Sequence, residues 1–138
     1  MLNLNLLETA KSAGTFNTLI AAIEKTGFAP MLEGPDFFTV LAPADEAFEQ
    51  LPEGTLESLD LPTLKKIVAY HILFGDVRSD DLIQIEEAET MEGSIVAIEH
   101  DDDGVTINDI KVLQTDILSN NGTIHRIDGV LMPTIMKK

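Results

Sequence analysis

The order of hydrophobic periodicities along the chain is the feature that most restricts its fold. In the first half, apolar residues recur at the three- and four-residue spacing of amphipathic helices, whereas the second half contains short runs rich in Ile and Val. One strand-like run lies among the helices. A nucleotide-binding sheet built from βαβ units would instead alternate strands and helices throughout. The sequence therefore predicts an α+β domain with a helical N-terminal half and a strand-rich C-terminal half.

Three segments carry the helical pattern: residues 4–26 with a break at Gly14-Thr15, residues 45–51, and residues 61–72, which Gly75 is expected to close. The segments expected to form strands are residues 37–41, 95–100, 104–107, 110–117 and 122–132.

Turn residues and acidic residues separate these strands. Asp103-Gly104 is a strong hairpin signal, because both positions tolerate the positive φ that tight hairpin turns require. The acid-rich stretches at residues 86–89 and 101–103 are expected to be solvated loops.

Size and composition exclude several classes of protein. The 138 residues, 44% hydrophobic and 24% charged, are enough for one globular domain spanning residues 1–138. The chain has no cysteine, which excludes disulfides, thiolate chemistry and cysteine-ligated metals. No apolar run approaches the roughly 20 residues that span a bilayer. Membrane insertion is therefore not expected.

The charge balance is strongly acidic. Nine Lys and Arg residues oppose 24 Asp and Glu residues, for a formal net charge of −15. Nucleic-acid binding depends on clustered cations, but here only Lys65-Lys66 and Lys137-Lys138 are adjacent. No nucleic-acid partner is predicted. The acidity favours basic partners or divalent cations, or serves solubility alone.

The N-terminal sequence, residues 1–8, lacks the basic n-region, the continuous apolar h-region and the small-residue cleavage site of a secretory signal. Two interpretations follow: the chain stays in the cytoplasm, or a signal has been removed from it.

Three segments in order resemble the signatures of the fasciclin-like (FAS1) domain family. Residues 39–48, Thr-Val-Leu-Ala-Pro-Ala-Asp-Glu-Ala-Phe, resemble its first signature, and Tyr70-His71-Ile72-Leu73 is similar to its central Tyr-His element. Residues 121–133, Asn-Gly-Thr-Ile-His-Arg-Ile-Asp-Gly-Val-Leu-Met-Pro, resemble its second signature. The resemblance extends from about Asn5 to Pro133 and is closest to a single-domain microbial member.

Two positions depart from the family pattern. Leu41 stands where the family usually has Phe, and Ala44 stands where it favours Thr. Without a threonine hydroxyl at position 44, the start of the following helix is expected to be capped by Asp45 or by water.

The resemblance implies a fasciclin-like β-wedge of strands with several packed helices. It also implies adhesion or protein interaction, with a protein partner or an extracellular-matrix or cell-surface component, in an extracellular, periplasmic or cell-surface location. It implies no common catalytic activity and no cofactor. The signature positions expected to be structural are Thr39, Pro43, Asp45, Phe48, His71, Asn121, Gly122, His125, Asp128 and Pro133.

The Tyr-His element has a structural and a functional interpretation. Helical spacing from Leu64 and Val68 places His71 on the apolar face, where a buried imidazole needs a hydrogen-bond partner. Thr39 or Asp45 is the expected partner. In some family members this region is linked to receptor binding, which makes Tyr70 and His71 candidate partner-binding residues. The alternative for Tyr70 is core packing with its phenol reaching water.

The remaining histidines and acids give weaker signals. His125 lies in a strand-like run and is expected to be structural, whereas His100 is expected to be exposed. Asp101 and Asp103 offer the hard oxygen ligands that calcium prefers, but the ligand spacing of an EF-hand is missing. A hairpin turn with exposed acids is the preferred interpretation, and no metal site is predicted.

The leading functional hypothesis is a non-enzymatic interaction module that binds through a rigid acidic surface. The sequence lacks the Gly-x-Ser-x-Gly elbow and phosphate-cradling loops. Two alternatives remain: a calcium-dependent or self-associating matrix protein, and an enzyme that uses carboxylates with His71 or His125 in an unrecognised pocket.

Overall fold

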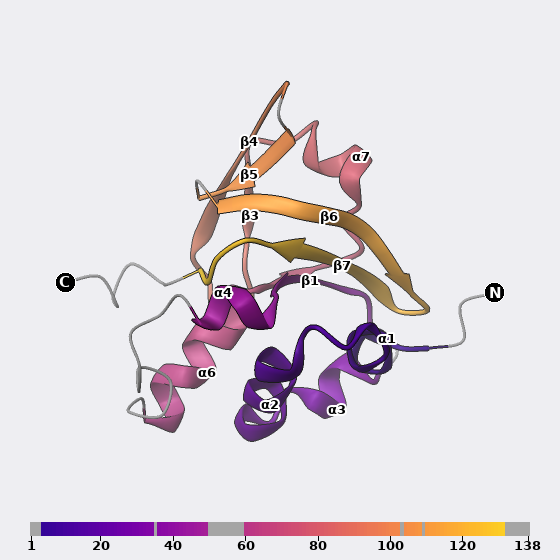
Figure 1. Cartoon of the computed structure of the whole chain (residues 1–138), viewed down its shortest axis with the longest axis vertical. Coiled ribbons are helices and arrows are strands. Elements are labelled where there is room, and N and C mark those ends of the chain that lie inside the picture. Colours follow the sequence, from indigo (N-terminus) through magenta and orange to yellow (C-terminus); the bar gives the residue numbers. More distant parts are fainter. Residues whose placement is uncertain (1–3, 35, 50–59, 103, 109, 132–138) are drawn as a thin grey trace.

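A curved sheet forms most of the C-terminal half, and helices from the N-terminal half pack against one side of it (Figure 1). The computed structural model describes residues 4–34, 36–49, 60–102, 104–108 and 110–131. The helices are α1 (Leu6–Ala13), α2 (Asn17–Thr26), α3 (Ala29–Leu32), α4 (Asp45–Glu49), α6 (Leu61–Tyr70) and α7 (Ser79–Leu82). The strands are β1 (Phe38–Pro43), β2 (Ile72–Phe74), β3 (Glu87–Glu89), β4 (Ile95–Asp101), β5 (Gly104–Ile107), β6 (Ile110–Ser119) and β7 (Gly122–Ile127).

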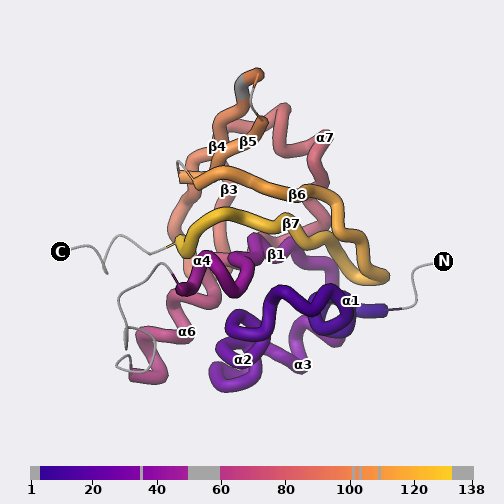
Figure 2. The backbone as a smooth tube through the Cα atoms, viewed as in Figure 1, coloured from indigo at the N-terminus to yellow at the C-terminus, as the bar shows by residue number. Residues whose placement is uncertain are grey.

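The strand order is β2-β1-β7-β6-β5-β4-β3. Strands β1 and β7 run parallel, although they are separated by most of the chain, and every other pair is antiparallel. The two ends of the sheet approach each other, since Leu73 bridges to Thr90 and the N–H of Met91 donates to the carbonyl of Ile72 at 2.8 Å. The sheet is therefore nearly closed into a barrel, and its curvature is visible in the backbone trace (Figure 2).

Two hydrophobic clusters lie on opposite faces of the sheet. One joins α1, α2, α3 and α6 to β1 and β7, with Phe16, Leu19 and Ile124 among its fully buried members. The other fills the inside of the curved sheet around Leu41, Ile107 and Ile127. Strand β1 contributes to both clusters, because its successive side chains point to opposite faces. This is why all six of its residues are buried.

Local signals in the sequence account for the helix ends. Helix α1 begins in a capping box, in which the Asn5 side chain accepts from the N–H of Glu8 and the Glu8 side chain accepts from the N–H of Asn5. Gly14 and Gly27 end α1 and α2 in left-handed conformations, with φ of 76° and 85°. The break predicted at Gly14-Thr15 is thus confirmed by the end of α1.

The predicted α+β class, with a helical N-terminal half and a strand-rich C-terminal half, is confirmed. Two local predictions are wrong. Ile72 lies in β2 rather than in the preceding helix, so Gly75 follows a strand instead of closing a helix. Residues 87–89 form β3 rather than a solvated loop, because Ala88 packs into the inner cluster and β4 supplies the hydrogen-bonding partner.

Strand β4 passes to β5 through a hairpin in which Asp101 is paired with Gly104. A hairpin is present where the Asp103-Gly104 signal predicts one, but Gly104 lies in β5 rather than in the turn, and Asp101 lies in β4 rather than in a loop. Asp103 itself lies outside the described residues, as does Pro133 of the second signature. Within the part of the chain that is described, no helix has the length and apolarity needed to cross a bilayer.

Candidate functional site

His71 is the first residue after α6, and its imidazole is buried between that helix and the end of the described chain. Its Nδ1 lies 2.7 Å from the carbonyl oxygen of Ile67, and the N–H of Leu131 donates to its Nε2 at 2.9 Å. Because a backbone N–H can only donate, Nε2 is the acceptor and the proton resides on Nδ1. The prediction that Thr39 or Asp45 is the partner of His71 is therefore wrong. Two backbone groups, at Ile67 and Leu131, form the hydrogen bonds of both ring nitrogens.

Burial has a direct electrostatic consequence at His71. Removal from water disfavours the imidazolium and lowers the pKa of His71 to about 4, against a smaller raising effect of the Ile67 carbonyl. Protonation would also replace the Nε2 lone pair with a second N–H that faces the N–H of Leu131. The neutral ring is thus part of the folded architecture.

Tyr70 is also buried, with 3% of its surface exposed. Its hydroxyl accepts a hydrogen bond of 2.8 Å from the side-chain amide of Asn108, which itself adopts a positive φ of 50° and pairs with the backbone of Ala97. The prediction that Tyr70 and His71 contact a partner is therefore corrected. Both side chains face the interior, where Tyr70 joins α6 to Asn108, directly after β5, and His71 joins it to Leu131.

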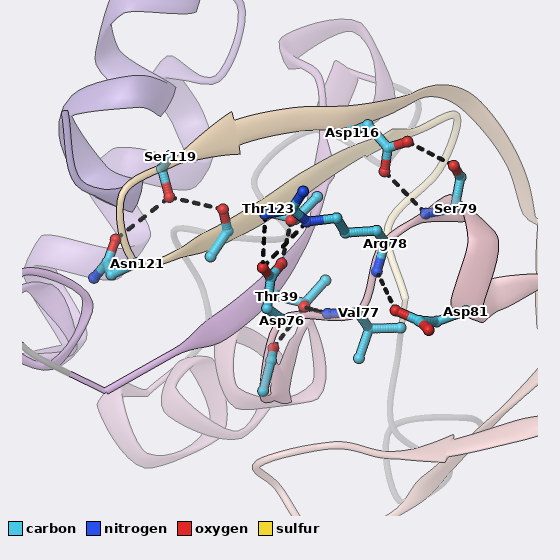
Figure 3. A network of polar contacts seen from close by, with 12 residues as sticks. Thr39, Asp76, Val77, Arg78, Ser79, Asp81, Asp116, Ser119, Asn121 and Thr123 are labelled. Carbon is cyan, nitrogen blue, oxygen red and sulfur yellow. Dashed lines mark hydrogen bonds and ion pairs between the residues drawn. The ribbon is translucent and has the colours of Figure 1, made fainter. Parts of the chain in front are cut away.

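A network of polar contacts holds the segment between β2 and α7 against the sheet (Figure 3). The Thr39 hydroxyl donates to the carbonyl of Gly75 and accepts from the N–H of Val77, both at 2.7 Å. His125 also binds this segment, since its Nε2 lies 2.7 Å from the carbonyl oxygen of Val77. The other ring nitrogen, Nδ1, accepts from the N–H of Asp116 at 3.3 Å.

Two carboxylates extend this network. Asp76 accepts from the hydroxyl of Thr123 and forms an ion pair with Arg78 at 3.0 Å. Asp116, at an irregular position of β6 with φ of 59°, accepts from the N–H of Ser79 at 2.9 Å. Partial burial acts to raise the pKa of Asp116, but the hydrogen bonds from Ser79, together with the charges of His125 and Arg78, outweigh it and hold that pKa below its usual range.

The polar groups of the network form hydrogen bonds with other protein groups, which does not favour a role in binding a substrate. Burial lowers the pKa of His125, despite the opposing effects of the Val77 carbonyl and of the Asp116 and Asp76 charges. Both of its ring nitrogens have protein partners. Among the described residues, no group of three or more His, Asp or Glu side chains is arranged to hold a metal ion.

Asp45 of the first signature has a role that the sequence did not reveal. It starts α4, but its carboxylate accepts from the N–H of Thr18 at 2.9 Å and from the Asn17 amide at 3.1 Å. It thereby caps α2, whose own N-cap residue, Phe16, supplies no side-chain hydrogen bond. Partial burial acts to raise the pKa of Asp45, and the hydrogen bonds from Thr18 and Asn17 outweigh it and lower that pKa.

Asn121 of the second signature connects three segments that are distant in sequence. Its side-chain oxygen accepts from the N–H of Leu6 at 2.8 Å, and its amide donates to the carbonyls of Leu32 at 2.7 Å and Gly34 at 3.2 Å. Its backbone carbonyl accepts from the N–H of Phe38. One buried residue therefore fixes the start of α1, the end of α3 and the start of β1.

Gly122 is required because of a close backbone approach. A Cβ at this position would lie 1.8 Å from the carbonyl oxygen of Phe38, on the paired strand β1. The oxygen belongs to the backbone, so it cannot move aside without disturbing the pairing of β1 with β7.

The remaining signature positions divide between core and surface. Pro43 ends β1. Phe48 on α4 packs into the hydrophobic cluster that joins the helices to β1 and β7. Asp128 has an exposed side chain, and its N–H donates to the carbonyl of Lys111.

The outer face of β3 and β4 combines exposed acidic and apolar side chains. Side chains alternate across a strand, and the inner positions Ala88 and Val96 are paired. The outward positions on the same two strands are therefore Glu87, Glu89, Ile95, Ala97 and Glu99, all of them exposed; we call this set the β3–β4 face.

An open groove continues the β3–β4 face at its edge. Its volume is about 580 Å³, and it lies between residues 83–86 and residues 97–100. Exposed Ile83, Glu86 and His100 line it. Sequence reasoning missed this surface because it placed Glu87 and Glu89 in a loop. The signal that could have found it is the alternation of acidic residues about Ala88.

Comparisons with known proteins agree with this architecture. The model of the Fasciclin domain matches residues 14–133. The chain belongs to the fasciclin domain family. Over 130 residues this fasciclin domain is 36% identical to the protein sll1735 of Synechocystis sp., covering 93% of this chain and 97% of that protein.

Animal relatives are similar along part of their length. The domain is 34% identical over 136 residues to transforming growth factor-beta-induced protein ig-h3 of Sus scrofa, covering 96% of this chain and 20% of that protein. It is 41% identical over 104 residues to human periostin, covering 73% of this chain and 12% of that protein.

The solved structure of a FAS1 domain pair from the insect cell adhesion molecule fasciclin I has the same fold. The TM-score is 0.67 at 21% sequence identity, covering 87% of this chain and 46% of that one. At this identity, the likeness establishes the fold alone.

The contact between Gly122 and Phe38 generates a first prediction. We expect Gly122→Ala to lower the free energy of unfolding by more than about 3 kcal/mol, because the new Cβ has to displace a paired strand. Gly14→Ala is the matched control: both glycines have a positive φ, 156° at Gly122 and 76° at Gly14, but no neighbouring atom lies within 4 Å of the Cβ position at Gly14. That variant is expected to lose about 1 kcal/mol. Urea unfolding of both variants measures the difference, and equal losses would contradict the steric account.

The buried imidazole generates a second prediction. The pKa of His71 is about 4 in the folded chain and about 6.5 when unfolded, so the unfolded state binds more protons between these values. His71 therefore contributes stability that is fully present above about pH 6.5. This contribution falls by on the order of 3 kcal/mol as the pH drops to about 4.

Urea unfolding from pH 7 to pH 4 measures this loss. His71→Gln should flatten the pH dependence, whereas His100→Gln, at an exposed position, should leave the slope unchanged. A His71→Gln variant with the wild-type slope would show that His71 does not titrate as its burial requires.

Proposed function

We propose that this fasciclin domain, taken as one domain over residues 1–138, is a non-enzymatic protein-interaction module of the adhesion type. Its binding surface is the β3–β4 face, and its partner is a basic protein segment. The observation that carries the proposal is the placement of Glu87, Glu89 and Glu99 on the same face of two paired strands as exposed Ile95 and Ala97.

The composition of the β3–β4 face suits a binding surface. Ile95 is 54% exposed and Ala97 is exposed beside it, which gives the face an apolar stretch along β4. Glu89 and Glu87 lie opposite these two residues on β3, and Glu99 continues the same face of β4. These carboxylates form a charged rim along the apolar stretch, and apolar residues bordered by polar ones are common in protein interfaces. Because backbone pairing fixes both strands, binding would order few additional groups.

The charge of the whole chain supports a basic partner. A net charge of −15 steers cations toward the molecule and repels anions. On the β3–β4 face this general attraction coincides with local carboxylates. Such steering raises the association rate, and it weakens as salt screens the charges.

Two further points support binding over catalysis. His71 and His125, the candidate acid–base residues, are buried and have both ring nitrogens in hydrogen bonds. The structural neighbour with the same fold comes from a cell adhesion molecule. Adhesion is thus a property of that protein, and we extend it to this chain as part of the proposal.

The proposal predicts the effect of reversing charge on the β3–β4 face. The probe is a synthetic decapeptide of alternating Lys and Leu, titrated by calorimetry in 50 mM and 300 mM salt. Glu87→Lys/Glu99→Lys should weaken binding by at least tenfold at the lower salt concentration, because it replaces rim carboxylates with like charges. Binding by the wild-type chain should weaken as salt rises.

Glu33→Lys/Glu49→Lys is the matched control, since it changes the net charge equally at exposed positions outside the face. It should weaken binding by less than threefold. Equal losses in the two variants would show that attraction to the whole molecule explains binding and would contradict a site on the β3–β4 face.

A further inference from the structure

A second groove lies on the helical side of the molecule, along the outer surface of α6. Its volume is about 420 Å³, and among the described residues it is lined by Phe28, Pro62, Lys65, Lys66, Ala69 and Met91, with Glu92 at its edge. The four α6 positions are spaced by three and four residues, so they share one face of the helix. Phe28 lies where α2 passes into α3, and α2 packs against α6.

The floor of this α6 groove is apolar. Ala69 is buried, Phe28 and Met91 are half-buried, and both of these larger side chains pack on the cluster beneath the helices. Each is therefore held from below while its upper side faces the groove. The floor is consequently fixed by the core, and an apolar side chain from a partner would find a formed surface.

The walls of the α6 groove carry positive charge, unlike most of the molecule. Lys65 and Lys66 are exposed, and the Lys65 ammonium lies 5.9 Å from the centre of the Phe28 ring. The two ion pairs recorded among the described residues use Lys11 and Arg78 rather than these lysines.

Among the described residues, the Asp60 and Glu92 carboxylates each accept a backbone hydrogen bond. Hydrogen bonds from Thr63 lower the pKa of Asp60, whose carboxylate caps α6 through the N–H of that residue, and the charge of Lys66 makes a smaller contribution in the same direction. Glu92 accepts from the N–H of Ser94 at 3.2 Å. Neither of these two acids forms an ion pair with Lys65 or Lys66 within the described part of the chain. The lysine head groups can therefore pair with a carboxylate of a partner.

We propose that the α6 groove binds an acidic, amphipathic segment of a partner protein. An apolar side chain of the segment contacts Phe28, Ala69 and Met91, and flanking carboxylates pair with Lys65 and Lys66. From Pro62 to Ala69, α6 rises about 10 Å, which matches about three residues of an extended chain. A segment of this length offers one apolar residue with an acid on either side.

Charge complementarity favours this occupant over a second copy of the chain or an anionic membrane. Two copies would each bring a net charge of −15, and an extended anionic surface would face the same charge over its whole contact area. A short segment presents only a few carboxylates. Its local attraction acts within the Debye length of about 8 Å at physiological salt, which screens the more distant acids. The α6 groove is independent of the β3–β4 face and would select the opposite charge.

The test uses an N-acetylated, amidated hexapeptide of sequence Glu-Asp-Leu-Phe-Asp-Glu, titrated into the chain with methyl-labelled methionine. NMR should show a saturable shift of the Met91 methyl signal, because that side chain lies in the groove floor. Lys65→Glu/Lys66→Glu should weaken binding at least tenfold, and Lys11→Glu/Lys111→Glu, at exposed positions on α1 and β6, should weaken it less than threefold. Thermal unfolding of both variants confirms that they are folded.

The proposal is overturned if the Met91 signal does not respond, or if both double variants lose affinity equally. It is also overturned if the same peptide with Gln and Asn in place of its acids binds as tightly, because charge pairing would then be absent. A Met91 shift with sodium laurate but not with the peptide would assign the groove to fatty acids instead. None of these results bears on the β3–β4 face, which the basic peptide tests.

Discussion

The buried side chain of Asn121 is the interaction on which the rest of this fasciclin domain depends. Its side-chain oxygen accepts from the N–H of Leu6, and its side-chain NH2 group donates to the carbonyls of Leu32 and Gly34. Its backbone carbonyl accepts from the N–H of Phe38 at the start of β1. Backbone groups at helix ends and strand starts lose water on folding and need such partners. Gly122 then allows β1 to lie directly against β7. The helical layer and the sheet are joined at this point.

Other signature residues also use a side chain to bind backbone groups of a distant segment. His71, Thr39, His125 and Asp45 each bind backbone groups of a segment that is far away in the sequence. A lost bond of this kind leaves a buried donor or acceptor unpaired, which costs about 1–3 kcal/mol. The polar hallmarks of the chain therefore act as architecture, and the surfaces proposed for binding lie on the outer side of β3–β4 and along α6.

Much of the fold could be predicted from the sequence, because helices and strands differ in the period of their apolar residues and glycines mark the helix ends. The prediction was wrong where one residue fits both patterns: Ile72 continues the spacing of α6, but pairing with β1 places it in a strand. It was wrong again at Glu87–Glu89, where an acidic tripeptide becomes a strand only through its partner β4. Local propensity carries no information about such partners.

The sites were harder to predict than the fold for a related reason. The burial of His71 followed from helical spacing, but its partner Leu131 is 60 residues away and offers a backbone group that no side-chain motif records. The α6 groove depends on Phe28 and Met91 coming together from separate segments. Lys65-Lys66 was visible as an adjacent pair, but its apolar floor was not.

Hydrogen exchange at four amides tests the architectural role of the signatures most directly. The N–H groups of Leu6, Thr18, Val77 and Leu131 donate to side chains of Asn121, Asp45, Thr39 and His71. If these contacts hold the fold together, the four amides should exchange only through global unfolding, with the same free energy as the central strands β1 and β7. Exchange through local opening at much lower free energy, while β1 and β7 stay protected, would contradict the account.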